Sequence, residues 1–117
     1  MGIVTSKNFK ARLNSGHYYG MLLENGFLVA RESVPSALTL EISQEGVLFQ
    51  GNLVAHAKSD GTFHFTHGAA DASGRWSIKG LLLEFQSKYI FYLCIDGKIS
   101  HYQSNDGCPT QMTIVGQ

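Results

Sequence analysis

Histidines are the side chains of this chain best able to bind a metal ion or to titrate near neutral pH, and there are five of them. His64 and His67 lie three residues apart on a predicted strand and its exit, so their side chains point to opposite faces and make a poor metal pair. His56 lies across the same predicted hairpin. No cysteine or carboxylate completes a recognised ligand spacing, so we expect no metal and no cofactor. We instead predict pH sensitivity at three histidines: His56, His64 and a partly buried His101.

Motifs for catalysis are missing from the sequence. It contains no nucleophile elbow, no glycine-rich phosphate loop before a helix and no HExxH. Asp71 and Asp106 lie in corresponding loops, and neither has an evident acid or base partner. We therefore expect a protein that is not an enzyme.

The two cysteines, Cys94 and Cys108, are too few for a disulfide framework. A single bridge is one reading, but we favour two free thiols in a reducing compartment. Cys94 lies on a predicted hairpin strand and is expected to be packed. Cys108 lies in a Gly-Cys-Pro loop and is expected to be the more exposed, ordinary loop cysteine.

Three loops are the places where binding residues are expected, because binding residues concentrate on loops held by a rigid scaffold. They span residues 32–36, 68–74 and 104–110. Tyrosines add aromatic contacts, although we expect several of the five to be core. The predicted ligand or partner contacts in or beside these loops are Glu32, Asp71, Arg75, Asn105 and Asp106.

Charge and the N-terminus limit the choice of partner. Basic and acidic residues are equal at 9 each, so the electrostatic footprint of a nucleic-acid-binding protein is missing. The first residues form no apolar signal segment, which predicts a cytoplasmic protein. Met1-Gly2 with Ser6 fits the N-myristoylation pattern, although a chance match or a vector-derived Met-Gly explains it equally simply. Acylation of Gly2 would give at most weak, reversible membrane association.

Three short apolar hairpins organise the chain. Each surrounds an Asx-Gly pair, which is the strongest local signal for a tight β-turn. The pairs end at Gly26, Gly61 and Gly97, so they recur at spacings of 35 and 36 residues. This spacing indicates a threefold repeat, whereas an ordinary antiparallel sandwich would not explain it.

We therefore predict one all-β domain over residues 1–117, with repeats at about 9–44, 45–80 and 81–117. Each repeat reads as strand, turn, hairpin, loop and strand, and the N-terminal strand completes closure beside the last strand. A bulge at each hairpin glycine would place three apolar pairs opposite each other. They are Leu22 with Leu28, Ala57 with Phe63, and Leu93 with Ile99. Further core positions are Leu13, Leu40, Ile42, Phe49, Trp76, Ile78, Phe85 and Ile114.

The repeat unit GxYxxxxxxDG, with the closing strands ALTLEI and RWSI, resembles the β-trefoil repeats of fascin and hisactophilin. RWSIKG and SKYIFYLCIDGKIS are similar to repeats of the fibroblast growth factor and interleukin-one branches. The resemblance covers nearly the whole chain and implies a β-trefoil: three pseudo-symmetric four-stranded repeats forming a six-stranded barrel and a hairpin cap. The chain differs from hisactophilin in having few histidines, from ricin-type lectins in lacking Gln-x-Trp, and from the growth factors in lacking a basic patch.

The resemblance implies a non-catalytic, monomeric binding module rather than a particular ligand. The first expectation is an intracellular protein-binding trefoil that associates with actin or with a membrane, like hisactophilin or fascin. The alternatives are a lectin of non-ricin type that binds glycans, and a signalling or protease-inhibitor trefoil.

Overall fold

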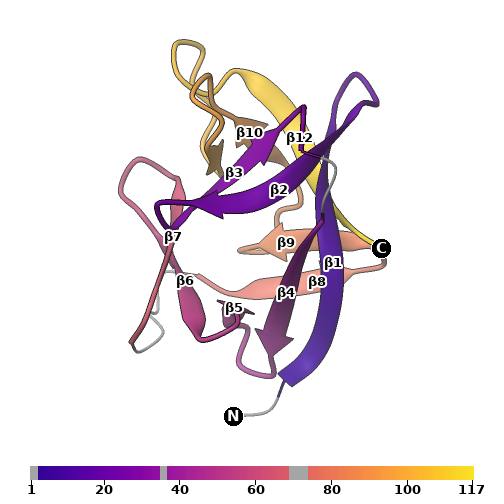
Figure 1. The fold of residues 1–117 in the computed structure, drawn as a ribbon, viewed down its shortest axis with the longest axis vertical. Coiled ribbons are helices and arrows are strands. Elements are labelled where there is room, and N and C mark those ends of the chain that lie inside the picture. Colours follow the sequence, from indigo (N-terminus) through magenta and orange to yellow (C-terminus); the bar gives the residue numbers. More distant parts are fainter. Residues whose placement is uncertain (1–2, 35–36, 69–73) are drawn as a thin grey trace.

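The computed structural model describes residues 3–34, 37–68 and 74–117, and its side chains from Thr5 onward (Figure 1). The predictions at Gly2 and Asp71 lie outside the described residues. Within them the fold is all-β, as predicted, and no helix there could span a bilayer. The strands are β1 (Ile3–Leu13), β2 (Tyr18–Glu24), β3 (Phe27–Arg31), β4 (Leu38–Ser43), β5 (Leu48–Gln50), β6 (Leu53–Ala57), β7 (Phe63–Thr66), β8 (Trp76–Lys79), β9 (Leu82–Phe85), β10 (Phe91–Leu93), β11 (Ile99–Ser100) and β12 (Thr110–Gly116).

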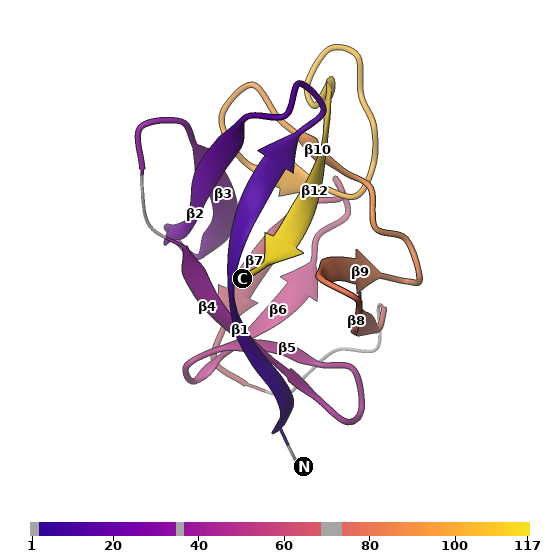
Figure 2. The same cartoon turned by 90° about the vertical axis from the view of Figure 1, so that its right-hand side faces the viewer.

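Antiparallel pairing closes the sheet into a barrel. The order β1-β2-β3-β7-β6-β5-β4 returns to β1 through the β1–β4 ladder, which makes a closed ring of seven strands. The expected barrel had six strands. β12 adds to β1 on the outside of this ring and carries β10, β11 and the β8–β9 hairpin. Figure 2 shows β1 and β12 side by side, paired from Phe9↔Gly116 to Leu13↔Met112, so the predicted closure of the first strand on the last is confirmed.

The hairpin register is as predicted in two hairpins. Ala57 pairs with Phe63 and Leu93 pairs with Ile99, each across a bulged turn. In both turns an aspartate stabilises the bulge: Asp60 Oδ1 accepts a hydrogen bond from the Thr62 N–H at 3.0 Å, and Asp96 Oδ1 accepts one from the Lys98 N–H at 3.1 Å.

The first hairpin departs from the predicted register. Leu28 pairs with Leu23 instead of Leu22, because Asn25 and Gly26 alone form the turn. Asn25 takes a φ of 52° and Gly26 a φ of 84°, the two positive angles that a two-residue turn of this kind requires. Asparagine tolerates this left-handed conformation better than most residues, and no bulge is then needed.

The three hairpins are joined in a cycle by backbone hydrogen bonds from the hairpin glycines. The carbonyl oxygen of Gly26 accepts from Phe65 N–H at 2.8 Å, and that of Gly61 accepts from His101 N–H at 3.0 Å. The carbonyl oxygen of Gly97 accepts from Ala30 N–H at 2.9 Å. Each hairpin turn is therefore hydrogen-bonded to the part of the next hairpin that follows its own turn.

Aromatic packing fills the interior. The fully buried Phe63 ring lies 4.8 Å from Trp76, 5.1 Å from Phe85 and 6.1 Å from Phe91, centroid to centroid. Most of the predicted core is buried: Leu13, Leu28, Leu40, Ile42, Phe63, Trp76, Phe85, Ile99 and Ile114. The remaining predicted core residues are only half-buried: Leu22, Phe49, Ala57, Ile78 and Leu93.

A disulfide joins Cys94 to Cys108, so the prediction of two free thiols is wrong. The tip of the β10–β11 hairpin and the loop before β12 lie together, because Ile95 N–H donates to the Gly107 carbonyl at 2.9 Å. Cys94 is nearly fully buried and Cys108 is half-buried. The expectation rested on the small number of cysteines, and the spatial closeness of the two positions overrides it.

Candidate functional site

A cleft of about 610 Å³ lies on the third hairpin unit. We call it the aromatic cleft. Its walls come from the connection between β9 and β10, from β10 itself and from the segment that follows β11. The lining residues are Ser87, Lys88, Tyr89, Ile90, Tyr92, His101, Tyr102 and Gln103.

A tight turn positions the first wall of the aromatic cleft. Phe85 and Lys88 exchange two backbone hydrogen bonds of 2.9 and 3.0 Å across Gln86 and Ser87. Gln86 takes a φ of 53° and Ser87 a φ of 64°, although neither is glycine, asparagine or aspartate. Such left-handed residues each cost about 1–2 kcal/mol. A third hydrogen bond, from Gln86 N–H to the Arg75 carbonyl at 2.8 Å, holds the turn against the residue that precedes β8.

His101 forms the base of the aromatic cleft. Its ring is half-buried, lying 4.8 Å from Phe85 and 5.4 Å from Phe63, with Tyr102 stacked obliquely at 4.2 Å. Burial in this aromatic surrounding lowers the pKa of His101, and the positive charge of Lys88 lowers it further. The imidazole is therefore neutral at neutral pH.

Tyrosine rings supply the open faces of the aromatic cleft. Tyr89 is 47% exposed and Tyr102 is 56% exposed, so both rings are open to a ligand. Tyr102 is held in place from below, since its N–H donates to the buried Ser100 Oγ at 3.0 Å. Tyr92 is half-buried.

The expectation that several tyrosines belong to the core is wrong. Tyr18, Tyr89 and Tyr102 are exposed, and Tyr19 and Tyr92 are half-buried. Phenylalanine and tryptophan fill the core instead. A phenol needs a hydrogen-bond partner when it is buried, and a phenylalanine ring does not.

Charge in the aromatic cleft is one-sided. Among the described residues that line it, Lys88 is the one cation, His101 is neutral, and none carries a carboxylate. Among the described residues, no carboxylate forms an ion pair with Lys88, whereas Arg31 pairs with Glu24 at 2.6 Å and Lys98 with Asp96 at 3.6 Å. This arrangement can stack a ring against tyrosine faces, hydrogen-bond hydroxyls and attract one negative charge.

Two of the three predicted pH-sensitive histidines come together: His56 and His64 are direct cross-strand partners in the β6–β7 hairpin. Neither of them lines the aromatic cleft, where His101 lies. His64 Nε2 lies 3.1 Å from the Asn25 carbonyl, and its ring meets the Phe27 ring edge-on at 4.6 Å. Within the part of the chain that the structure describes, no group of three histidine, cysteine or acidic side chains is placed to hold a metal ion.

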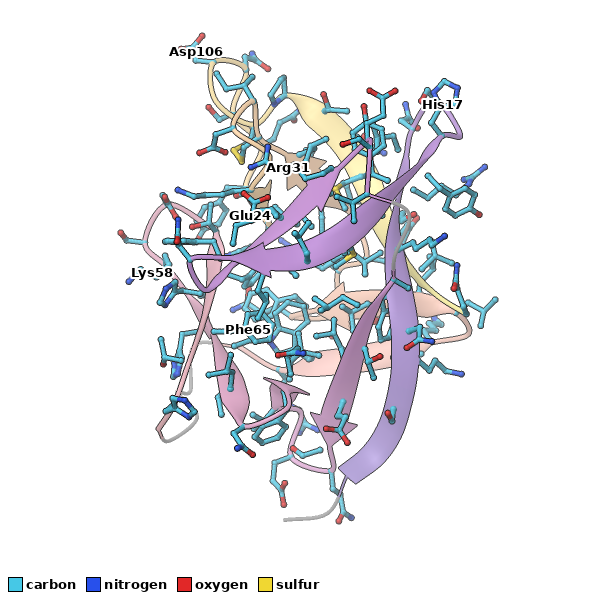
Figure 3. The ribbon with its side chains drawn as sticks, in the orientation of Figure 1. His17, Glu24, Arg31, Lys58, Phe65 and Asp106 are labelled. Atoms are coloured by element: carbon cyan, nitrogen blue, oxygen red, sulfur yellow. A yellow bond between two sulfur atoms is a disulfide. The ribbon has the colours of Figure 1, made fainter. Side chains whose placement is uncertain are left out.

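The four predicted loop residues that the structure describes do not line the aromatic cleft. Glu32 is exposed beside a hollow of about 310 Å³ that also contacts Pro109, so two of the three loops meet there. Arg75 is exposed, with Nη2 3.5 Å from the Gln44 carbonyl, beside a separate hollow of about 290 Å³. Asn105 and Asp106 are exposed, and Asp106 projects at the tip of its loop (Figure 3).

Sequence reasoning missed Lys88 and Gln103 as site residues, and it treated Tyr89, Tyr92 and Tyr102 only as general aromatic contacts. One signal was available: the predicted turn over residues 86–88 contains no glycine, ends at Lys88 and is followed directly by Tyr89. Comparison with protein-family models, with curated proteins and with solved structures gave no match. Function therefore rests on the chemistry of the chain itself.

Proposed function

We propose that the protein is a non-catalytic binding module of β-trefoil type, and that it binds carbohydrate in the aromatic cleft. The cyclic hydrogen bonds from Gly26, Gly61 and Gly97 support the trefoil assignment, because each relates one hairpin to the next. The ladders β1–β4, β4–β5, β8–β9, β9–β12 and β12–β1 also support it. They are five of the six contacts that a ring of β1, β4, β5, β8, β9 and β12 would need. The sixth place holds a hydrogen bond from Trp76 N–H to the Gly46 carbonyl at 2.8 Å.

The observation that carries the carbohydrate proposal is the cleft's lining: three tyrosine rings and five further side chains, of which only Ile90 is apolar. A pyranose ring presents C–H groups on its faces and hydroxyls around its rim. Tyrosine faces pack against the C–H groups, while phenol, imidazole, amide and hydroxyl groups bond the rim. The volume of about 610 Å³ falls within the range of about 300–1,000 Å³ typical of small-ligand sites.

A glycan array followed by titration calorimetry tests the proposal. Tyr89→Ala should weaken binding of an array hit by at least about tenfold, since a buried aromatic contact of this kind contributes about 1–3 kcal/mol. Tyr18→Ala is the matched control, because Tyr18 is 55% exposed and lies outside the cleft. An array without hits, or equal losses in the two variants, would count against carbohydrate binding.

A second candidate function is protein binding, and it is favoured by Ile95. This side chain is 80% exposed at the tip of the third hairpin, on a turn braced by the Cys94–Cys108 disulfide. A rigidly held apolar side chain of this kind is a typical anchor for a protein partner. The expected partner, actin, is tested by co-sedimentation with filaments at pH 7 and pH 6. Pelleting that Ile95→Ser abolishes would support it, and no pelleting at either pH would remove it.

The disulfide bears on the expected location as well. Cytoplasmic location was inferred partly from free thiols, whereas disulfides are typical of oxidising compartments. We therefore propose that the protein functions where the Cys94–Cys108 bridge persists. Acylation of Gly2 stays a prediction, which the intact mass of the native protein tests.

A further inference from the structure

We infer that the ligand of the aromatic cleft is an acidic sugar, whose single carboxylate pairs with Lys88. This inference depends on the proposed carbohydrate binding and names the ligand class. The charge of the cleft lining differs from that of the whole chain. The whole chain balances 9 basic against 9 acidic residues, yet the described residues of the cleft lining include one lysine and no carboxylate. A bound carboxylate would supply the missing partner, and a charge-assisted hydrogen bond to an ammonium is stronger than a neutral one.

The backbone that carries Lys88 is fixed in an unfavourable conformation. The turns at the corresponding place in the other two units contain glycine with positive φ: Gly16 at 96° and Gly51 at 61°. In the third unit, Gln86 and Ser87 adopt positive φ without glycine. Strained backbone of this kind concentrates at functional sites, where it fixes a neighbouring side chain. Here the turn ends at Lys88.

The protonation of His101 should be coupled to the binding of an anion in the aromatic cleft. The groups that surround its ring are Phe63 from β7, Phe85 from β9, Tyr102 and, as the one charged neighbour in the cleft, Lys88. Tyr89 and Tyr92 are the other titratable residues of the lining. A carboxylate beside Lys88 would offset the lysine charge and favour imidazolium. By linkage, the same ligand must bind more tightly once His101 is protonated.

The inference is confined to one site on the molecule. Positions in the three units can be compared by their distance before the hairpin glycine. At the positions of Lys88 and Tyr89, the first unit has His17 and Tyr18, and the second has Asn52 and Leu53. Counted forward, His101 corresponds to Ala30 and to Phe65. Neither other unit repeats the lysine, tyrosine and histidine set, so we expect one ligand per chain.

A single lysine also limits the charge of the ligand. A polysulfated chain carries many charges and requires a field of several cations, whereas the lining offers one. A uronic or sialic acid residue carries one carboxylate on a hydroxylated ring, and this carboxylate stays ionised at pH 5.5.

Titration calorimetry on matched sugar pairs tests the inference. The probes are methyl β-glucuronide against methyl β-glucoside, and sialyllactose against lactose, at pH 7.5 and pH 5.5 in low salt. At least one acid should bind about tenfold more tightly than its neutral match, with a stoichiometry of one. Its affinity should increase at pH 5.5, and His101→Asn should remove that increase.

Variants assign the effect to Lys88. Lys88→Gln should lower affinity for the acid about tenfold more than it lowers affinity for the neutral sugar. Lys79→Gln is the control, because Lys79 is an exposed lysine of β8 outside the cleft. Equal binding of acid and neutral sugars, unaffected by Lys88→Gln, would overturn the inference and leave carbohydrate binding standing. Binding of neither member of either pair would overturn both.

Discussion

The N–H of His101 donates a hydrogen bond to the carbonyl oxygen of Gly61 across 3.0 Å. This contact joins the turn of the second hairpin to the base of the aromatic cleft on the third. The α-carbon of Gly61 also lies against the side chains of Ser100 and Tyr102, the two residues on either side of His101. A Cβ at this position would come 2.5 Å from Ser100 Oγ and 2.7 Å from Tyr102 Cδ2. The cleft therefore depends on a residue that does not line it.

Gly61→Ala should lower the free energy of unfolding by about 3 kcal/mol, from left-handed backbone and overpacking together. Gly61 has a φ of 92°, and Ser100 beneath it is fully buried and has little room to move. Gly51→Ala is the matched control: its φ is 61°, but no atom lies within 4 Å of the added Cβ. That variant should lose only about 1–2 kcal/mol. Urea unfolding of both measures the difference, and equal losses would contradict it.

Stability should fall below neutral pH because of His101. Its pKa is lower in the folded protein than in the unfolded chain, first through burial and then through Lys88. The unfolded chain therefore takes up the proton first. The stabilisation is complete above the ordinary histidine pKa of about 6.5 and is lost as the pH falls from there toward the folded-state pKa.

Unfolding of the wild type and of His101→Asn, measured between pH 5 and pH 8, checks this dependence. The difference in stability between the two proteins should shrink as the pH falls below about 6.5. His17→Asn is the control, since His17 is exposed on the β1–β2 turn (Figure 3). A pH-independent difference for His101→Asn would show that its packing contributes and its titration does not.

The Cys94–Cys108 bridge should be present in the purified protein and should stabilise it. Its cysteines are 14 residues apart, and closing a loop of this size contributes about 3 kcal/mol. The double variant Cys94→Ala/Cys108→Ala should lose about that much, and the Ile95 amide, which bonds to Gly107, should exchange faster with solvent. A thiol assay in denaturant without reductant should find no free thiol, and two free thiols would contradict the bridge.

Local sequence patterns predicted the fold class because the turn and strand signals are local. Asp-Gly and Asn-Gly located all three hairpins. These dipeptides did not distinguish the two turn types. In one type the Asx side chain accepts a hydrogen bond from a later backbone N–H, as at Asp60. In the other type the Asx backbone adopts a positive φ, as at Asn25. The error shifted one strand pairing by a single residue, from Leu22 to Leu23 opposite Leu28.

The aromatic cleft could not be predicted in the same way. Lys88 precedes the β10–β11 hairpin and His101 follows it, and they approach only because the hairpin returns the chain to the same place. The alternation of apolar and polar residues along the strands predicted which residues face inward, as at Phe63 and Ile99. It did not separate tyrosine from phenylalanine at partly inward positions, where the need of the phenol for a partner decides the outcome. Of the loops predicted to bind, residues 32–34 and 104–110 do not line the cleft.

Replacing Gln86-Ser87 with Asn-Gly should stabilise the protein by about 1–2 kcal/mol, because the new residues adopt the same positive φ angles at lower cost. The observed φ angles are 53° at Gln86 and 64° at Ser87, against 52° at Asn25 and 84° at Gly26. The opposite exchange, Asn25→Gln with Gly26→Ser, should destabilise by more than this amount, since a Cβ at Gly26 would come 2.6 Å from His64 Nε2. Urea midpoints measure both variants. A loss of stability on introducing Asn-Gly at 86–87 would contradict the prediction, because it would mean that the Gln86 and Ser87 side chains contribute more than the left-handed backbone costs.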